Sequence, residues 1–348
     1  MVKSIQSLRY IFAIIIFLHH FIVDGKGLFD AGGPLGVSFF IILSGVVMSL
    51  GYYEKCNSPL FLYKSFILKR IIRLYPLHLL CLTIYIIMNP GVYHLGGILQ
   101  LIPNLLMLQS WIPIQNVYFS GNAVSWCLAD MMFFYATFPF LVKYFKKTST
   151  TKLFYTLGVI YIIYFIFVIN IPDQYSHCIL YISPLVRLLD FIVGIGIYNF
   201  YIKFGETIRN HFTTITSALL GICIILILFI SIILYKHISI NFTYAFMYMI
   251  PISLLITYAL IFNNKRGGVL NIFNNRILYK MGEVSFSFYM IHILSIQFFN
   301  KIIDYFGLVI EWEIKLIIYL ILISFASLLI YNIFEKPISK YLQKKLIS

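Results

Sequence analysis

The sequence contains few charged residues. Only 11% of its 348 residues are Asp, Glu, Lys or Arg, whereas 61% are hydrophobic. A soluble domain of this size needs a much larger polar and charged surface. This shortage excludes an ordinary soluble globular protein and predicts a polytopic membrane protein in contact with the lipid bilayer.

Cysteine and acidic residues are also scarce. The five cysteines are scattered without CxxC spacing, and the eight histidines form no HxH or HExxH pattern. We therefore predict no disulfide framework and no metal site. Twelve acidic residues stand against 26 basic ones, a net charge of +14. Such an excess can indicate nucleic-acid binding, but in a membrane protein Lys and Arg gather in cytoplasmic loops.

The sequence contains many long apolar windows. Windows of about 18–22 residues predict membrane-spanning helices, and they recur along the whole chain. We expect an all-α polytopic membrane protein, a single integral-membrane domain over residues 1–348 with about ten transmembrane helices. The helices are expected at about 6–23, 34–53, 70–89, 124–144, 153–170, 179–200, 213–235, 242–262, 284–301 and 314–334.

The basic residues predict the orientation of these helices. The two termini and every second loop hold 21 Lys and Arg, and the intervening loops hold 4. This bias predicts that both termini are cytoplasmic, and it explains the net charge without nucleic acid. The long segment 90–123 has no Lys or Arg. Gly96, Gly97 and Pro103 interrupt its apolar part, so we do not expect it to form a membrane-spanning helix. We expect the segment outside, at the membrane interface or as a lid.

Two ionisable residues share one face of the first predicted helix. Eleven steps of about 100° bring His20 within about 20° of Arg9, roughly 16 Å further along the axis. Ionisable groups inside a membrane are costly and indicate function by default. In the predicted orientation Arg9 lies at the cytoplasmic end and His20 near the outer end. We interpret the pair as the two ends of a chemical path across the membrane.

Six further motifs follow the Arg-x10-His spacing along the chain. Together they resemble the membrane-bound acyltransferase-3 family, over about residues 5–337. The motifs are GGPLGVSFFIILSGVVMSLGY (32–52), KRIIRLYPL (69–77), SWCLADMMFFY (125–135), RLLDFIVGIG (187–196), MGEVSFSFYMIH (281–292) and FEKP (334–337).

The resemblance implies an enzyme of the bacterial inner (cytoplasmic) membrane. Members of the family transfer an acyl group, most often acetyl from acetyl-CoA, to a hydroxyl of an envelope glycan, a lipid-linked sugar or a small glycoside. The sequence lacks the soluble hydrolase-like domain fused to some relatives, so later handling of the acyl group is expected to need a separate envelope partner. A homo-oligomer is also compatible with the sequence.

Two residues are candidates for catalysis. His20 matches the family's essential histidine, and an imidazole can take the proton of an attacking hydroxyl. The alternatives are that His20 briefly carries the acyl group itself, or that it is a structural histidine at the membrane interface. Asp130 stands where relatives usually have Glu, and its shorter side chain leaves its role in doubt. It is expected either to orient His20 or to accept a hydrogen bond from the acceptor sugar.

Four basic residues are candidates for binding the acyl donor. Arg9 matches the motif arginine, and Lys69, Arg70 and Arg73 form a cluster in which the family keeps Arg-x-x-Arg. Guanidinium groups suit the phosphates of CoA. For Arg9 the alternatives are a contact to the pantetheine arm, a structural ion pair or a snorkelling anchor. For the cluster the alternative is an ordinary positive-inside signal.

Three further residues are candidates for binding the acceptor substrate. Trp126 can stack on a sugar ring or belong to the aromatic belt at the interface. Tyr289 and His292 either line the cavity or form interhelical hydrogen bonds. Within the predicted sixth helix, Arg187 and Asp190 are expected to form a buried pair that neutralises itself. The small residues Gly32, Gly36, Ser44 and Gly45 favour close helix packing over a channel for the pantetheine arm.

Two alternatives to acetyl transfer onto a glycan stay open. A transporter or flippase of a glycan or lipid would use the same ten helices without chemistry. An acyltransferase with a succinyl or longer donor, or with a small-molecule acceptor, would fit the same motifs.

Overall fold

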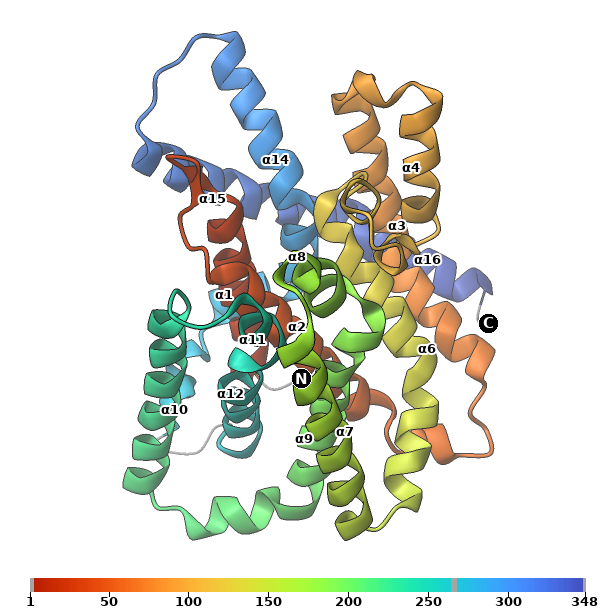
Figure 1. Cartoon of the computed structure of the whole chain (residues 1–348), viewed down its shortest axis with the longest axis vertical. Helices are drawn as coiled ribbons and strands as arrows, with labels where there is room; N and C mark the ends of the chain where they lie inside the picture. The colour runs from red at the N-terminus through yellow and green to blue at the C-terminus, as the bar shows by residue number, and fades with distance from the viewer. Residues whose placement is uncertain (1–2, 264–267, 347–348) are drawn as a thin grey trace. The chain divides into compact units, whose positions relative to one another are not determined.

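The computed structural model describes residues 3–263 and 268–346, and it is helical in most of them (Figure 1). The chain divides into two compact units that alternate along the sequence. Unit 1 comprises Met1–Ile5, Val37–Leu62 and Phe133–Asn274. Unit 2 comprises Gln6–Gly36, Tyr63–Met132 and Asn275–Ser348. The prediction of a single domain over the whole chain stays a prediction.

Unit 1 holds the middle of the chain and most of α2. Several of its helices are joined through short 3-10 or π-helical turns. Its elements are α2 (Gly32–Tyr52), η1 (Lys55–Asn57), α6 (Trp126–Lys147), α7 (Thr150–Asn170), α8 (Asp173–Ser176), the π-helix η5 (His177–Ile182), α9 (Pro184–His211), α10 (Thr214–Leu234), α11 (Ile240–Phe242), the π-helix η6 (Thr243–Met247), α12 (Met249–Ile261) and η7 (Val269–Phe273).

Unit 2 holds most of the first helix and the C-terminal helices. The first turns of α2 and α6 also belong to it. Its elements are α1 (Lys3–His20), β1 (Ile22–Val23), β2 (Lys26–Gly27), α3 (Tyr63–Met88), η2 (Pro90–Val92), α4 (Leu95–Leu105), η3 (Gln109–Trp111), α5 (Gln115–Tyr118), η4 (Ala123–Ser125), α13 (Arg276–Glu283), α14 (Ser285–Tyr305), α15 (Trp312–Ile330), the π-helix η8 (Tyr331–Glu335) and α16 (Lys336–Leu346).

The predicted fold class is confirmed. A helix lies at each of the ten expected positions, and among the described residues nine helices are long and apolar enough to cross a membrane. The helix outside that group is α1, which has only 18 residues and carries Lys3, Arg9 and two histidines. The apolar helices α7 and α10 leave most of their surface exposed in the folded chain, as expected where lipid covers a helix. The cytoplasmic placement of the termini stays a prediction.

Several predicted helix boundaries are wrong. The first helix ends at His20 instead of residue 23, because a hairpin begins there. The third begins at Tyr63 instead of residue 70, so Lys69, outside the expected helix, lies inside it together with Arg70 and Arg73. The sixth begins at Pro184, a residue suited to the first helical position, and it continues past residue 200 to His211. The predicted loop 263–282 includes residues 264–267, which lie outside the described residues.

Close helix packing explains the small residues of α2 within unit 1. A Cβ added to Gly45 would collide with backbone atoms of Phe191 and Gly194 on α9, and one added to Gly194 would collide with α2. The two backbones therefore touch, as small residues permit. This confirms the packing interpretation for Gly45.

The buried charge pair of unit 1 is also confirmed. Arg187 Nη1 lies 2.9 Å from Asp190 Oδ2, and both side chains are almost fully buried. The same guanidinium donates to the carbonyl of Tyr244 at 3.0 Å and to the hydroxyl of Ser38 at 3.3 Å. Each residue therefore has the other as its opposite charge, and Arg187 has two further polar partners, as buried ions require.

Candidate active site

His20 is the last residue of α1, and a tight hairpin follows it. Asp24 and Gly25, both with positive φ, form the two-residue turn between β1 and β2, as Asp-Gly turns commonly do. The chain then returns to α1, where the amide of Phe29 donates to the carbonyl of Leu18 at 3.3 Å. The hairpin thus satisfies a carbonyl at the helix C-terminus and fixes the position of His20.

Glycines allow the returning chain to lie directly against α1. A Cβ on Gly32 would collide with the carbonyl of Ile15, and a Cβ on Gly36 would collide with the side chain of Ile16. A Cβ on Gly33 would come within 2.8 Å of the His19 ring. The start of α2 is therefore a small surface for α1 to pack on, which confirms close packing for Gly32 and Gly36.

His20 contacts His292, a residue 272 positions later on α14. Nδ1 of His20 lies 3.2 Å from Nε2 of His292, and the ring centroids are 5.1 Å apart. His292 is fully buried, whereas His20 is only half-buried. The His19 ring packs on the His20 ring at a centroid distance of 4.9 Å, and its Nδ1 donates to the carbonyl of Asp30. The structure thus brings His20 and His292, two of the predicted site residues, together.

The carbonyl partners assign the tautomers of this pair. Nδ1 of His20 lies 3.0 Å from the carbonyl of Ile16, and Nδ1 of His292 lies 2.6 Å from the carbonyl of Tyr289. Because a carbonyl only accepts, each Nδ1 carries the hydrogen. Nε2 of His292 is then an acceptor for His20. Nε2 of His20 keeps its lone pair, and no other described residue donates to it.

A buried polar loop, residues 104–125, packs on the turn of α14 that precedes His292. Tyr289 donates from its hydroxyl to the carbonyl of Val124 at 2.9 Å, and Asn122 donates from its amide to the carbonyl of Met290 at 2.7 Å. Residues 122–124 therefore lie against the turn of α14 that precedes His292. Tyr289 is half-buried beside this loop, in keeping with either interpretation of its role.

The loop contains its own network of amide and hydroxyl groups. Asn104 donates to the carbonyl of Ser120 at 2.5 Å and to the hydroxyl of Ser125 at 3.0 Å, and Gln109 donates to the same hydroxyl at 3.2 Å. All of these side chains are buried. The side-chain carbonyl oxygens of Asn104, Gln109 and Asn122 receive no hydrogen bond from any described residue. Buried acceptors of this kind are usually satisfied by water or ligand.

Sequence reasoning missed this polar loop. Its only signals were the absence of Lys and Arg from segment 90–123 and a run of amide and hydroxyl residues after Pro103. Trp126 and Asp130 follow the loop on the first turns of α6, with 4% and 0% of their surface exposed. Burial of Trp126 in the protein does not fit a residue of the lipid-facing aromatic belt. Asp130 is buried one turn further along the helix.

Three of the four predicted donor residues lie on the early turns of α3, and the fourth, Arg9, lies on α1. Arg73 forms an ion pair with Glu335, whose other oxygen accepts from the Ser287 hydroxyl at 2.5 Å. Arg9 and Arg73 both lie close enough to the Tyr331 hydroxyl for their positive charges to act on it. The structure therefore brings two of the four predicted donor residues to one region of unit 2. Lys69 and Arg70 are half-buried on the same helix, next to Arg73 in sequence.

Comparison with known proteins identifies the family. The model of the acyltransferase domain of the acyltransferase-3 family matches residues 2–334. The chain belongs to the acyltransferase-3 family. A relative named acyltransferase MdmB, from Streptomyces mycarofaciens, is 26% identical over 336 residues, which cover 86% of this chain and 80% of the relative. No solved structure matches the chain.

Family membership confirms the resemblance seen in the motifs. This acyltransferase-3 protein is an enzyme that transfers acyl groups, and it is a multi-pass membrane protein. A transporter without chemistry is therefore not the function of the chain. The described residues hold no group of three or more His, Cys, Asp and Glu arranged for a metal ion.

Proposed function

We propose that the protein is an O-acyltransferase of the inner membrane that moves an acetyl group from cytoplasmic acetyl-CoA to a sugar hydroxyl. The acceptor is an envelope glycan or a lipid-linked sugar. The observation that supports this most strongly is the imidazole of His20, whose Nε2 keeps a lone pair while its Nδ1 bonds to the carbonyl of Ile16 and to Nε2 of His292. An imidazole held in one tautomer is suited to act as a general base.

The reaction is an attack of the acceptor hydroxyl on the thioester carbonyl. Nε2 of His20 takes the hydroxyl proton as the oxygen bonds to the carbonyl carbon. The tetrahedral intermediate then collapses, the carbon–sulfur bond breaks, and His20 returns the proton to the leaving thiolate of CoA. The products are a sugar acetate and free CoA, and no oxidant or metal is needed.

The basic residues fit the donor end of this path. Arg9 lies eleven residues before His20 on α1, roughly 16 Å along the helix axis at 1.5 Å per residue. The CoA phosphates would be bound by Arg9, Lys69 and Arg70, with Arg73 contributing while it also pairs with Glu335. A thioester bound at this end extends along α1 toward His20.

The acceptor end of the path is supported by the buried polar loop. Trp126 directly follows this loop and Asp130 lies one turn further along α6. On α14, Tyr289 donates to the loop at Val124, and His292 bonds to the carbonyl of Tyr289. Amide, hydroxyl and aromatic groups are the usual partners of sugars, because sugars present both hydroxyls and apolar ring faces. Asp130 would accept a hydrogen bond from the acceptor in this arrangement.

The test is transfer from labelled acetyl-CoA by the purified protein in lipid nanodiscs. Glycolipids extracted from the cell that makes this protein serve as acceptors, and succinyl-CoA serves as a competing donor. We expect label to appear in an ester that mild alkali releases, with acetyl-CoA preferred over succinyl-CoA. Binding of acetyl-CoA without any label transfer would contradict the proposal, and so would a preference for the succinyl donor.

A further inference from the structure

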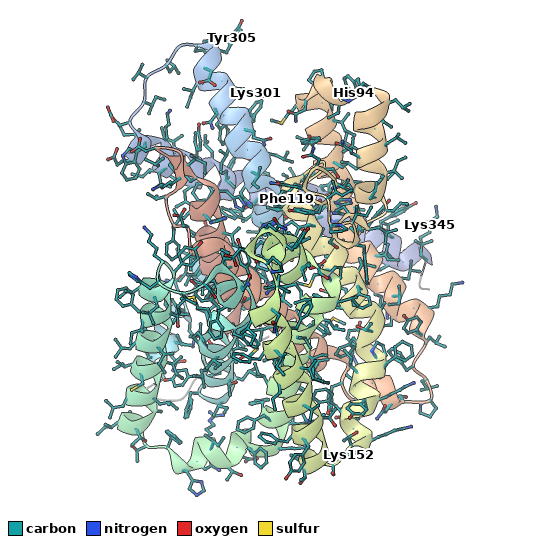
Figure 2. The ribbon with its side chains drawn as sticks, in the orientation of Figure 1. His94, Phe119, Lys152, Lys301, Tyr305 and Lys345 are labelled. Carbon is teal, nitrogen blue, oxygen red and sulfur yellow. The ribbon has the colours of Figure 1, made fainter. Side chains whose placement is uncertain are left out.

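A hollow of about 300 Å³ lies between the last turn of α3 and the first turns of α4 and α5 in unit 2. It is separate from the contact between His20 and His292, and none of the predicted site residues lines it. Phe119, labelled in Figure 2, belongs to its wall. The residues that matter for its chemistry are Tyr85, Gln100, Gln115, Asn116, Phe119 and Ser120.

The lining carries hydrogen-bonding groups but no charge. Gln100, Gln115 and Asn116 are exposed, and their amide groups make no side-chain hydrogen bond to any described residue. The hydroxyl of Ser120, a residue with 7% of its surface exposed, also lacks a protein partner in the described part of the chain. These groups offer both donors and acceptors to a ligand.

The rings of Tyr85 and Phe119 complete the lining. Both residues are half-buried, so part of each ring can cover an apolar face of a ligand. A small hollow with aromatic walls and a few polar groups is the usual form of a ligand site. Without Lys or Arg the lining offers no cationic side chain to the phosphates of CoA, and the three amides disfavour an acyl chain, whose burial would leave them unpaired.

The hollow is connected to His20 through named contacts. Ser120 accepts from Asn104, and Gly121 holds a positive φ of 65° where a Cβ would collide with Leu82. The next residue, Asn122, donates to the carbonyl of Met290, two positions before His292. A ligand held in the hollow therefore lies on the loop that is fixed against the turn of α14 before His292.

We propose that this hollow binds an uncharged sugar ring of the acceptor, away from the hydroxyl that is acylated. The proposal rests on the proposed function, because it assigns the acceptor's second contact with the enzyme. It makes segment 90–121 the part of the chain that selects among acceptors. An acceptor with at least one further sugar ring is preferred over a single alcohol.

The test uses methyl glycosides of glucose, galactose and N-acetylglucosamine as probes. Binding to the full-length protein in nanodiscs is measured by saturation-transfer difference NMR, with acetyl-CoA affinity measured in parallel. The variants are the double Gln115→Ala/Asn116→Ala, the single Gln100→Ala, and Phe119→Ala with Phe119→Tyr as the conservative rescue. Gln343→Ala on α16 is the matched control, because Gln343 is another exposed glutamine of unit 2.

We expect at least one glycoside to bind the wild type. The double variant should weaken that binding at least about tenfold, since two hydrogen bonds are lost. Gln100→Ala and Phe119→Ala should weaken it several-fold, and Phe119→Tyr should restore it. Acetyl-CoA affinity and the thermal midpoint should stay at wild-type values in every variant, as they should in Gln343→Ala.

Two outcomes would overturn the proposal: no glycoside binds the wild type, or the double variant binds as the wild type does. Either result beside acetyl transfer in the nanodisc assay would remove the sugar site and leave the proposed function standing. Glycoside binding that the variants weaken, without transfer of acetyl label, would leave the sugar site and remove the proposed function.

Discussion

Unit 1 and unit 2 both bury polar and ionisable side chains among apolar helices, but the Arg187–Asp190 pair of unit 1 and the His20–His292 pair of unit 2 have different partners. In unit 1, Arg187 and Asp190 face each other at 2.9 Å, and carbonyl and hydroxyl groups take further hydrogens of the guanidinium. In unit 2, the contact between His20 and His292 joins two imidazole rings and includes no pair of opposite charges. Their partners there are carbonyl groups of their own helices.

The difference separates a structural pair from a chemical one. A buried ion pair satisfies its own charges, so little of it is left for a ligand. An imidazole oriented by its Nδ1–H keeps Nε2 for proton transfer. Burial alone therefore does not mark a catalytic residue, and a ring nitrogen left able to transfer a proton is the better indicator.

The replacement His20→Ala tests the chemical side of this comparison most strongly. Removal of the general base should lower the rate of acetyl transfer about 10²–10⁴-fold. The measurement is the initial rate with labelled acetyl-CoA, normalised to the amount of protein in the membrane. His211→Ala is the control, because His211 is exposed and bonds only to a carbonyl of its own helix. A wild-type rate in His20→Ala would remove the role given to His20.

The replacement Arg187→Ala tests the structural side. It leaves Asp190 buried without its counter-charge, so the free energy of unfolding should fall by about 3 kcal/mol or more. The double replacement Arg187→Met/Asp190→Leu should recover most of this loss because no charge stays buried. Thermal unfolding in detergent gives both values. Equal stability of the single and double variants would show that the pair is not the stabilising feature.

The replacement His292→Phe separates the role of His292 from that of His20. The ring keeps its approximate size but loses the Nε2 acceptor and the Nδ1 donor. His20 keeps its hydrogen bond to Ile16, so kcat should fall only about tenfold, or about 1.4 kcal/mol of transition-state stabilisation. Acetyl-CoA affinity should not change. A loss as large as that of His20→Ala would mean that His292 itself transfers the proton.

The replacement Arg70→Ala should have the smallest effect, a several-fold loss of acetyl-CoA affinity through one charged hydrogen bond. Isothermal calorimetry on the purified protein measures this affinity. Lys340→Ala, an exposed basic residue of α16, controls for loss of positive charge alone. Arg73→Ala should additionally lower the thermal midpoint, because Glu335 loses its ion pair. Equal affinity in Arg70→Ala and Lys340→Ala would make Arg70 a topology signal.

The sequence predicted what depends on periodicity and composition. The ten helices follow from apolar windows, and the alignment of Arg9 with His20 on one helix follows from their spacing. The Arg187–Asp190 pair could be predicted because its members are three residues apart on one helix. These features are local, so a single segment contains all the information.

The contacts of His20 could not be predicted in the same way. His292 is 272 residues away, and its approach depends on how α1 and α14 pack. The polar loop 104–125 has no periodic pattern, and its amides meet only after the chain has folded. The start of α3 was misplaced because hydropathy windows begin at the apolar residues, whereas the helix includes the basic turn before them. The π-helix η8 likewise has no signal in composition, yet it carries Glu335.

The cluster of Arg73, Glu335 and Ser287 also sets where the chain can be cut. Glu335 fastens the end of η8 to α3 and α14, and Ser339 adds a contact to Ile72. Most of α16 beyond Ser339 is solvent-accessible, so an affinity tag joined after it leaves these contacts intact. A truncation before Glu335 would instead remove α16 and leave Arg73 on α3 without its ion pair.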